Sequence, residues 1–292
     1  MLANFDEIKI FFDKDSSPLQ ALKHELFSQK KVTVLLKRDD LISEQFVGNK
    51  FRKLKYNLLE ASKLGSKTLI SFGGAYSNHL KAFTSIGPLF GFETICFVRG
   101  EELDEESNLI LQNANNQSVK LIFVDRERYK NKEKLLEQLD VEAYVIPEGG
   151  TNRFAILGIG EMIDEILVDC TPTHICTATG TGGTFAGILA KNLINVKILG
   201  FSSFKKNNEI EALLLANQID NTNFEIINRY AFGGYGKTKP ELLGFINQFY
   251  KDFKIQLDPI YTGKMMFGLM DMIKNDYFSE GSTIVAIHTG GV

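Results

Sequence analysis

Two short stretches of the sequence hold residue types that do chemistry: a run of glycines and threonines, and a lysine at the start of a predicted helix. The run TATGTGGTFAG, residues 177–187, follows a strand-like stretch and precedes an apolar one. Glycines remove side chains where the backbone must approach a ligand closely. A helix that starts behind such a turn directs its backbone N–H groups at an anion. The run therefore predicts a phosphate site formed by Gly180, Thr181, Gly182, Gly183 and Thr184.

Neither common nucleotide signature fits this run. The pattern G-x-G-x-x-G fails because Phe185 stands where its last glycine is required, and the P-loop pattern fails because no Gly-Lys-Thr closes the run. A second stretch, AFGGYGKT, has Ala231 at the first P-loop glycine but ends in Lys237 and Thr238. A P-loop nucleotidase on this second stretch is one alternative, and a tight turn without a ligand is the alternative for residues 177–187.

The lysine is Lys50, in the stretch EQFVGNKFRKL. Asn49 is a suitable N-cap, so Lys50, Arg52 and Lys53 crowd the first turn, where the helix dipole disfavours positive charge. One interpretation is a solvated basic patch. The other is that the pKa of Lys50 is lowered, because a positive dipole end and desolvation both favour the neutral amine. A lysine of that kind is a nucleophile or a Schiff-base former.

Polar residues also stand at the ends of three other predicted elements. Ser77 and Asn78 begin a predicted helix in SFGGAYSNHLKAF, either as caps or as a seat for a carboxylate. His79 follows them and is interpreted as a packed or solvated histidine without a catalytic role. Tyr261 precedes a predicted helix, and Thr289 follows the last apolar strand, where ligands of parallel sheets bind.

These residues need a scaffold, and short aliphatic runs alternate with amphipathic ones along the chain. Such alternation predicts an α/β fold with parallel sheets that are covered on both faces. The predicted strands are 32–36, 68–71, 94–98, 120–124, 143–146, 173–176, 196–201, 225–228 and 283–287. The predicted helices are 49–64, 78–90, 131–139, 154–167, 184–193, 209–216, 240–250 and 263–273. A glycine-rich break at 147–155 separates two α/β units.

Composition excludes several classes of function. The chain has 292 residues and a net charge of −3, so no basic field indicates nucleic acid or an anionic membrane as a partner. Its three cysteines and four histidines show no metal-ligand spacing, and a reducing compartment fits the cysteines better than disulfides do. No run reaches the roughly 18 apolar residues of a membrane span, and the first residues do not form a signal peptide. We therefore expect a cytoplasmic protein without a metal.

Six motifs occur in order and together resemble one family. They are KRDDL (37–41), GNKFRKLKY (48–56), GGAYSNH (73–79), GTGGT (180–184), LDPIYTGK (257–264) and HTGG (288–291). They are similar to those of the 1-aminocyclopropane-1-carboxylate deaminases and D-cysteine desulfhydrases, which are pyridoxal-phosphate enzymes of the tryptophan synthase β-like, fold type II group. The resemblance implies two packed domains with twisted, mostly parallel sheets, namely a small one at 53–147 and a larger cofactor-binding one at 1–52 and 148–292. It also implies a homodimer.

The resemblance implies a role for each candidate residue around pyridoxal 5′-phosphate. The turn at 180–184 holds the phosphate, and Lys50 is covalently attached to the cofactor. Asn78 binds the 3′-oxygen, and Ser77 assists amine exchange and proton movement beside the substrate carboxylate. The remaining matches are Tyr235 and Tyr261, the two active-site tyrosines, and Thr289, a hydroxyl near the pyridine nitrogen. The implied reaction is β-elimination from a small amino acid, which releases a keto acid and ammonia.

The choice within the family depends on Thr262. The cyclopropane-opening deaminases carry an acidic residue at this position, near the ring nitrogen, whereas Thr262 is neutral. This favours a D-cysteine desulfhydrase-like lyase, with a 1-aminocyclopropane-1-carboxylate deaminase as the alternative if Glu241 or Asp258 approaches the nitrogen. Val47 and Tyr76 replace a glycine and a glutamine common in the family, and they motivate a third hypothesis, a non-catalytic protein that binds an amino acid or the cofactor.

Overall fold

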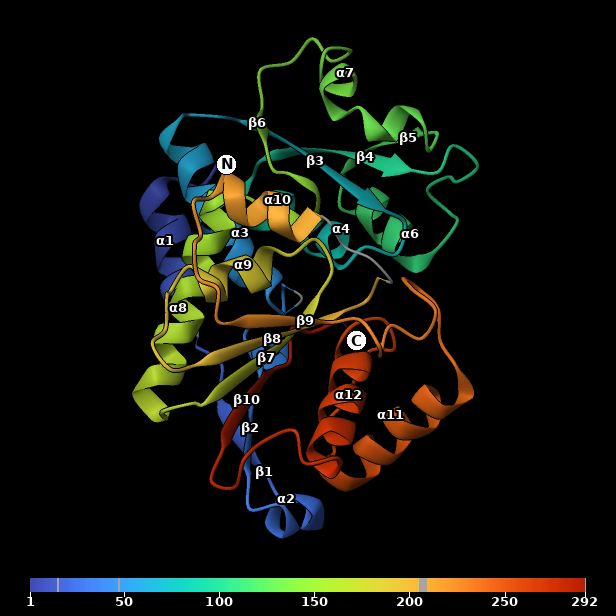
Figure 1. Cartoon of the computed structure of the whole chain (residues 1–292). Coiled ribbons are helices and arrows are strands. Elements are labelled where there is room, and N and C mark those ends of the chain that lie inside the picture. The colour runs from blue at the N-terminus through green and yellow to red at the C-terminus, as the bar shows by residue number, and fades with distance from the viewer. Residues whose placement is uncertain (15, 47, 205–208, 292) are drawn as a thin grey trace. The chain divides into compact units, whose positions relative to one another are not determined.

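The chain forms two compact units of α/β structure. The computed structural model describes residues 1–14, 16–46, 48–204 and 209–291, so Val47 lies outside the described residues. The first unit consists of Met1–Asp15 and Glu44–Ala155, and the second of Ser16–Ser43 and Ile156–Val292. The α/β class expected from the sequence is confirmed (Figure 1). The domain ranges that the resemblance implies remain a proposal, and the two units are described separately below.

The first unit is built on a wholly parallel sheet of four strands. Their order is β5 (Lys120–Val124), β4 (Glu93–Arg99), β3 (Thr68–Gly74) and β6 (Tyr144–Val145). Its helices are α1 (Phe5–Asp13), α3 (Lys50–Lys63), α4 (Asn78–Phe83), α5 (Ile86–Phe90), α6 (Leu109–Asn116) and α7 (Lys132–Leu136), with the 3₁₀ turns η2 (Arg128–Lys130) and η3 (Glu148–Gly150). Because the strands are parallel, their carboxyl ends, at Gly74 and Arg99, meet at one edge of the sheet.

The second unit is built on a sheet of six strands. Their order is β1 (Leu19–Leu22), β2 (Thr33–Lys37), β10 (Thr283–Ile287), β7 (His174–Thr179), β8 (Lys197–Ser202) and β9 (Phe224–Ile227). Only the β1–β2 pair is antiparallel. Its helical elements are α2 (Glu25–Gln29), η1 (Asp39–Leu41), most of α8 (Arg153–Asp169), α9 (Gly183–Leu189), α10 (Glu209–Ala216), α11 (Pro240–Phe253) and α12 (Thr262–Lys274).

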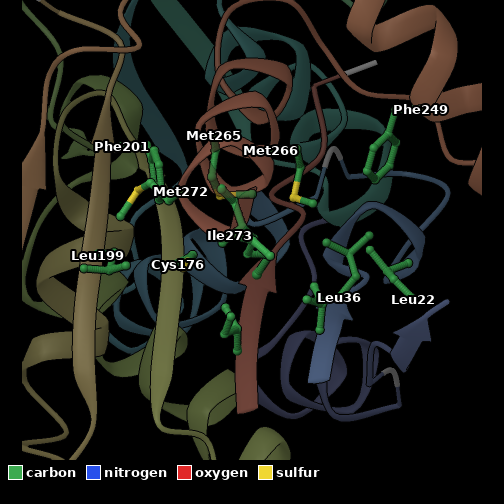
Figure 2. Packing of buried hydrophobic residues seen from close by; sticks show 14 of the residues in the cluster. Leu22, Leu36, Cys176, Leu199, Phe201, Phe249, Met265, Met266, Met272 and Ile273 are labelled. Atoms are coloured by element: carbon green, nitrogen blue, oxygen red, sulfur yellow. The ribbon is translucent and has the colours of Figure 1, made fainter. Parts of the chain in front are cut away.

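Both faces of the six-stranded sheet are buried, because consecutive strand residues point to opposite sides. On one face, Cys176 and Leu199 join a cluster with side chains of α11 and α12, and Figure 2 shows Met265, Met266 and Phe249 in the same cluster. On the other face, strand residues such as Ile175 and Ile198 pack against a second apolar cluster. Continuous aliphatic strands such as IVAI follow from this two-sided burial.

Most predicted elements are present, with two kinds of difference. All nine predicted strands occur, and the bounds 120–124 and 283–287 agree with β5 and β10. The helix predicted at 78–90 is divided into α4 and α5. Three α-helices and one strand were missed, namely α1, α2, α6 and the edge strand β1, and the 3₁₀ turns η1, η2 and η3 were not predicted either. In the described part of the chain, no helix combines the length and apolarity that a membrane span requires.

Candidate active site

Lys50 is the first residue of α3, in the first unit. Asn49 occupies the N-cap position but makes no capping hydrogen bond with its side chain. Arg52 and Lys53 are only 3% and 2% exposed, so the interpretation of this turn as a solvated basic patch is wrong. The Lys50 ammonium donates a hydrogen bond of 3.1 Å to the carbonyl of Gly149, a residue 99 positions along the chain.

Burial makes the amine of Lys50 unusually easy to deprotonate. Desolvation lowers the pKa of Lys50 to about 8, and a hydrogen bond with Lys53 opposes the shift. The pKa of Lys53 falls well below its ordinary value through desolvation and through the charge of Lys50. At pH 7, a pKa of about 8 leaves about 10% of the amine neutral, against roughly 0.04% for an ordinary lysine. The lowered pKa agrees with the second of the two interpretations of Lys50, and its role as a nucleophile stays a prediction.

We expect the chemical reactivity of Lys50 to report this pKa directly. The neutral amine reacts and the ammonium does not, so acylation of Lys50 by acetic anhydride should rise with pH up to about 8 and then level off. Quantitative peptide mass spectrometry of briefly labelled apoprotein gives the rate at each pH. The same peptide in urea is the control and should titrate near an ordinary lysine pKa of about 10.4. A native rate that follows the urea curve would contradict the desolvated amine.

The carboxyl end of β3 leads into a turn that begins α4. Ser77 is the N-cap of α4, and its side chain accepts hydrogen bonds from the backbone N–H groups of His79 and Leu80 at 3.2 and 3.4 Å. The capping role expected for Ser77 is confirmed. Asn78 is the first residue of α4.

His79 is buried near Lys50 and Lys53. The surroundings of His79 could not be predicted from the sequence. Ser71 Oγ donates to the Ile146 carbonyl at 2.8 Å and lies 2.7 Å from His79 Nε2, so Nε2 carries the ring proton. Among the described residues, His79 Nδ1 has no hydrogen-bond partner. Desolvation and the charges of Lys50 and Lys53 hold the pKa of His79 well below its ordinary value. His79 is therefore a neutral imidazole, and packing with Ser71 explains its burial.

The glycine run lies at the carboxyl end of β7, in the second unit. Gly182 has a left-handed φ of +82° and is the N-cap of α9, which starts at Gly183. A Cβ on Gly180 would lie only 2.9 Å from Cε1 and 3.1 Å from the hydroxyl of Tyr261. The buried hydroxyl of Thr179 has no hydrogen-bond partner among the described residues. The turn and the helix start thus lie where the sequence predicted them, and the phosphate site at 180–184 stays a prediction.

The two candidate tyrosines lie near this turn within the second unit. Tyr261 is the N-cap residue of α12, and its ring centroid is 6.1 Å from that of Tyr235. Tyr235 stacks on Phe204 with the ring planes 10° apart. The buried ammonium of Lys264 donates to the carbonyls of Ala231 and Gly234 at 2.9 Å each and fixes the loop that carries Tyr235. Phe204 and Lys264 are supporting residues that sequence reasoning missed.

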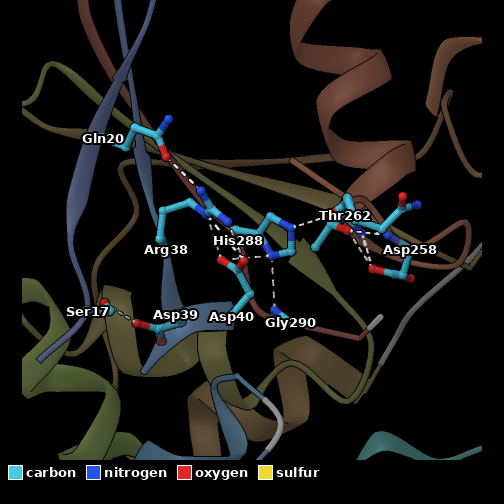
Figure 3. Close-up of polar contacts among 10 residues, drawn as sticks. Ser17, Gln20, Arg38, Asp39, Asp40, Asp258, Thr262, His288 and Gly290 are labelled. Carbon is cyan, nitrogen blue, oxygen red and sulfur yellow. Dashed lines mark hydrogen bonds and ion pairs between the residues drawn. The ribbon is translucent and has the colours of Figure 1, made fainter. Parts of the chain in front are cut away.

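Asp258 and Thr262 form a closed capping unit at the start of α12 (Figure 3). The Asp258 carboxylate accepts hydrogen bonds from the backbone N–H groups of Ile260, Tyr261 and Thr262 at 2.7 to 2.9 Å and from the Thr262 hydroxyl at 2.6 Å. Thr262 is fully buried. The carboxylate thus fixes the backbone at Tyr261, a role that the sequence analysis did not consider for it.

Thr289 follows β10, and its chain neighbours His288 and Gly290 belong to a second polar network. Figure 3 shows this network. His288 Nε2 lies 2.7 Å from the Gln256 carbonyl and therefore donates to it. His288 Nδ1 accepts from the Gly290 N–H at 3.2 Å and lies 3.5 Å from Asp40 Oδ1. Arg38 binds the Asp40 carboxylate through Nε and Nη2. This network fixes the backbone on both sides of Thr289.

Some of the candidate site residues thus belong to the first unit and the others to the second. Lys50, Ser77 and Asn78 belong to the first, and the glycine turn, both tyrosines and Thr289 belong to the second. The described residues contain no cluster of His, Cys, Asp or Glu suited to a metal. A half-buried amine with a lowered pKa suits an aldehyde, and a glycine turn at a helix start suits a phosphate. The residues present therefore fit pyridoxal phosphate.

Comparison with known proteins agrees with this chemistry. The family described as "Pyridoxal-phosphate dependent enzyme" matches residues 15–290. A Thermotoga maritima protein named "Putative 1-aminocyclopropane-1-carboxylate deaminase" is 30% identical over 94% of both chains. A Klebsiella pneumoniae protein named "D-cysteine desulfhydrase" is 28% identical over 88% of this chain and 86% of its own.

A solved structure shows the same fold over nearly the whole chain. It is described as an "ACC deaminase homologue", is 27% identical, and superposes with a TM-score of 0.79 over 98% of this chain and 95% of its own. The resemblance drawn from the six motifs is confirmed. The chain belongs to the pyridoxal-phosphate-dependent enzymes, in the group that contains proteins named as 1-aminocyclopropane-1-carboxylate deaminases and D-cysteine desulfhydrases.

Proposed function

We propose that this enzyme is a D-cysteine desulfhydrase-like lyase that eliminates a β-substituent from a small amino acid and releases a keto acid and ammonia. The observation that carries the proposal is the amine of Lys50 at the start of α3, which donates to the Gly149 carbonyl at 3.1 Å and whose pKa is lowered by desolvation. When bound, pyridoxal phosphate acts as an electron sink for negative charge at the substrate α-carbon. The protein supplies the attachment point, the orientation of the substrate and the proton transfers.

The residues of the first unit are assigned to attachment, proton transfer and substrate orientation. Lys50 carries the cofactor and, once its amine is released, takes the α-proton at Nζ. The Gly149 carbonyl holds that ammonium afterwards. Ser77 and Asn78 stand at the start of α4, where a substrate carboxylate suits the helix end and sets which bond at the α-carbon breaks. Asn78 is also assigned to the cofactor's 3′-oxygen.

The residues of the second unit are assigned to cofactor binding and to the leaving group. The turn at 180–184 binds the phosphate, and Tyr261 packs against Gly180 beside it. Tyr235 is half-exposed and is assigned, with Tyr261, to the substrate side chain. Thr289 places a hydroxyl toward the pyridine nitrogen, and His288 holds the backbone next to it.

Thr262 supports the choice of β-elimination over cyclopropane opening. Its hydroxyl is bonded to Asp258, and four hydrogen bonds occupy that carboxylate. With Thr262 and Thr289 both neutral, the pyridine nitrogen lacks the carboxylate that would strengthen the electron sink. Elimination of a good leaving group such as a thiol needs less carbanion stabilisation than opening a ring does. The names of several relatives still favour 1-aminocyclopropane-1-carboxylate as the second candidate substrate.

A keto-acid assay across D-cysteine, L-cysteine, D-serine, L-serine and 1-aminocyclopropane-1-carboxylate tests the substrate. We expect pyruvate from D-cysteine at a kcat/KM at least about tenfold above that for the other four, which is a difference of about 1.4 kcal/mol in transition-state binding. Fastest turnover of the cyclopropane, with 2-oxobutanoate as product, would establish the deaminase instead. Cofactor binding without turnover of any of the five would favour the non-catalytic hypothesis.

Three further features complete the proposal. A homodimer is proposed on the family resemblance, and sedimentation of the holoenzyme tests it. A cytoplasmic location is proposed because Cys96, Cys170 and Cys176 are all free thiols. We also propose 53–147 as the small domain and 1–52 with 148–292 as the larger one, which limited proteolysis tests.

A further inference from the structure

The turn that leads from β3 into α4 is closed by a backbone hydrogen bond. The Ser77 N–H donates to the Gly74 carbonyl at 3.0 Å, so Ala75 and Tyr76 are the two central residues. Tyr76 does not adopt a positive φ, so the turn is not of type II. Types I and II differ in the orientation of the central peptide, whose oxygen is here the Ala75 carbonyl. The direction of this carbonyl therefore determines how the turn delivers Ser77.

The Ala75 carbonyl is held by a side chain from another segment of the first unit. Asn108 Nδ2 donates to this carbonyl at 3.2 Å, across 33 positions of the chain. Asn108 is also the N-cap of α6, and its Oδ1 accepts from the N–H groups of Ile110 and Leu111 at 2.9 and 3.0 Å. Because two N–H donors fix the amide oxygen, the amide nitrogen is the atom that faces Ala75. One side chain thus joins the start of α6 to the turn before α4.

The loop that carries Asn108 is itself fixed at both ends. Gly100, which follows β4, donates its N–H to the Val124 carbonyl at 2.8 Å. At the other end, Ser107 Oγ donates to Asp104 Oδ1 at 2.6 Å and accepts from the Asp104 N–H at 2.9 Å. Asn108 follows this closed turn directly, so its position relative to the sheet is defined.

The position of Ser77 matters because its hydroxyl has one role in the fold and another in the proposed reaction. The oxygen accepts from the N–H groups of His79 and Leu80 and so caps α4. Among the described residues, no acceptor takes the hydroxyl proton. That proton is available to the substrate carboxylate, which the proposed function places at Ser77. A misplacement of about 1 Å at such a contact costs roughly 10²-fold in rate.

We propose that Asn108 is a positioning residue, which holds the turn through the Ala75 carbonyl and thereby places the Ser77 hydroxyl at the substrate carboxylate. This role rests on the proposed function, in which Ser77 orients the substrate. Asn108 acts only through the turn. Its loss should therefore affect most strongly those substrates that carry a carboxylate.

Two substitutions at Asn108 remove the donor and keep the helix cap. Aspartate and serine cap helices about as well as asparagine does. The aspartate side chain, when ionised, has no donor, and the serine side chain is one bond too short to replace Nδ2. Agreement between Asn108→Asp and Asn108→Ser excludes an effect of the new charge. The matched control is Asn131→Asp, the same exchange at the N-cap of α7, where Oδ1 accepts from the Lys134 N–H at 3.1 Å.

Amide hydrogen exchange of the holoenzyme tests whether Asn108 holds the turn. The N–H groups of Ser77, His79 and Leu80 should exchange about fivefold faster in both Asn108 variants, which is the effect of losing one ordinary hydrogen bond. Asn131→Asp should leave these rates unchanged. Unchanged exchange at all three amides in both Asn108 variants would refute the inference, whether or not D-cysteine is the substrate.

Turnover tests whether the turn serves the substrate carboxylate. The kcat/KM for sulfide release from D-cysteine should fall at least about tenfold in both Asn108 variants. Release from D-cysteine methyl ester, which lacks the carboxylate charge, should fall less than about threefold. A general loss of structure would lower both values equally, so an equal fall, or no fall for either substrate, would refute the positioning role. A wild-type enzyme that releases no sulfide from D-cysteine would contradict the proposed function, and the exchange rates would still decide whether Asn108 holds the turn.

Discussion

Replacing Lys50 by alanine is expected to lower kcat/KM by about 10³-fold or more and to leave no covalently held cofactor. The side chain has two tasks, attachment and proton transfer at Nζ, and a positioned base alone contributes roughly 10²–10⁴-fold. Stopped-flow turnover of D-cysteine and the visible absorbance of the dialysed protein measure the two effects. Lys50→Arg should be as inactive as the alanine variant, because a guanidinium keeps the charge but cannot be deprotonated in a protein.

The control for this experiment is Lys63→Ala. Lys63 is in the last turn of the same helix, α3, and its side chain is exposed, so its replacement should leave both turnover and absorbance unchanged. Retention of more than about a tenth of wild-type kcat/KM by Lys50→Ala would contradict the role of this amine, since so small a loss is under 1.4 kcal/mol of barrier.

Replacing Asp258 by alanine is expected to lower the free energy of unfolding by about 3–5 kcal/mol. The substitution leaves three backbone N–H groups and the buried Thr262 hydroxyl without their acceptor, and hydrogen bonds to a charged group are each worth about 1.5–3 kcal/mol, although not additively. Urea unfolding of the wild type and the variant gives the change in the free energy of unfolding. Activity should fall as well, because the same carboxylate fixes the backbone of Tyr261.

Two milder variants separate the capping role from simple loss of packing. Asp258→Asn keeps one acceptor oxygen and should lose about half as much stability as the alanine variant. Thr262→Val removes only the hydroxyl that bonds the carboxylate at 2.6 Å and should cost about 1–2 kcal/mol. An alanine variant no less stable than Thr262→Val would show that the backbone hydrogen bonds to Asp258 contribute little.

The strands were predictable because each is an aliphatic run that the fold buries on both faces. Prediction of the helices depends more on the residues at their ends. In α1, a capping signal of this kind was overlooked. Asn4 accepts from the Glu7 N–H while Glu7 accepts from the Asn4 N–H, a capping box that is visible in the sequence as N-x-x-E. In α6, LILQNANN contains too few apolar residues for a strong helical period, although Asn108 caps it.

The candidate site shows a similar division between local and long-range information. The glycine turn, the Ser77 cap and the position of Tyr261 before α12 follow from neighbouring residues and were predicted. The burial of Lys53 and the contact between Lys50 and Gly149 join segments about 100 residues apart, and no spacing rule reports them. Asp258 is an intermediate case, because an aspartate that accepts from the N–H groups two and three residues further on is a local turn signal, yet it was considered only as an acid.

The most direct test of the account is the site of cofactor attachment. Holoenzyme reduced with borohydride and digested with trypsin should yield one peptide that carries the reduced cofactor, and fragmentation should place the added mass on Lys50. The denatured apoprotein treated in the same way controls for unspecific labelling. Stoichiometric modification of Lys50 is the result predicted here, and modification of Lys53, Lys264 or any other lysine in its place would contradict the central claim.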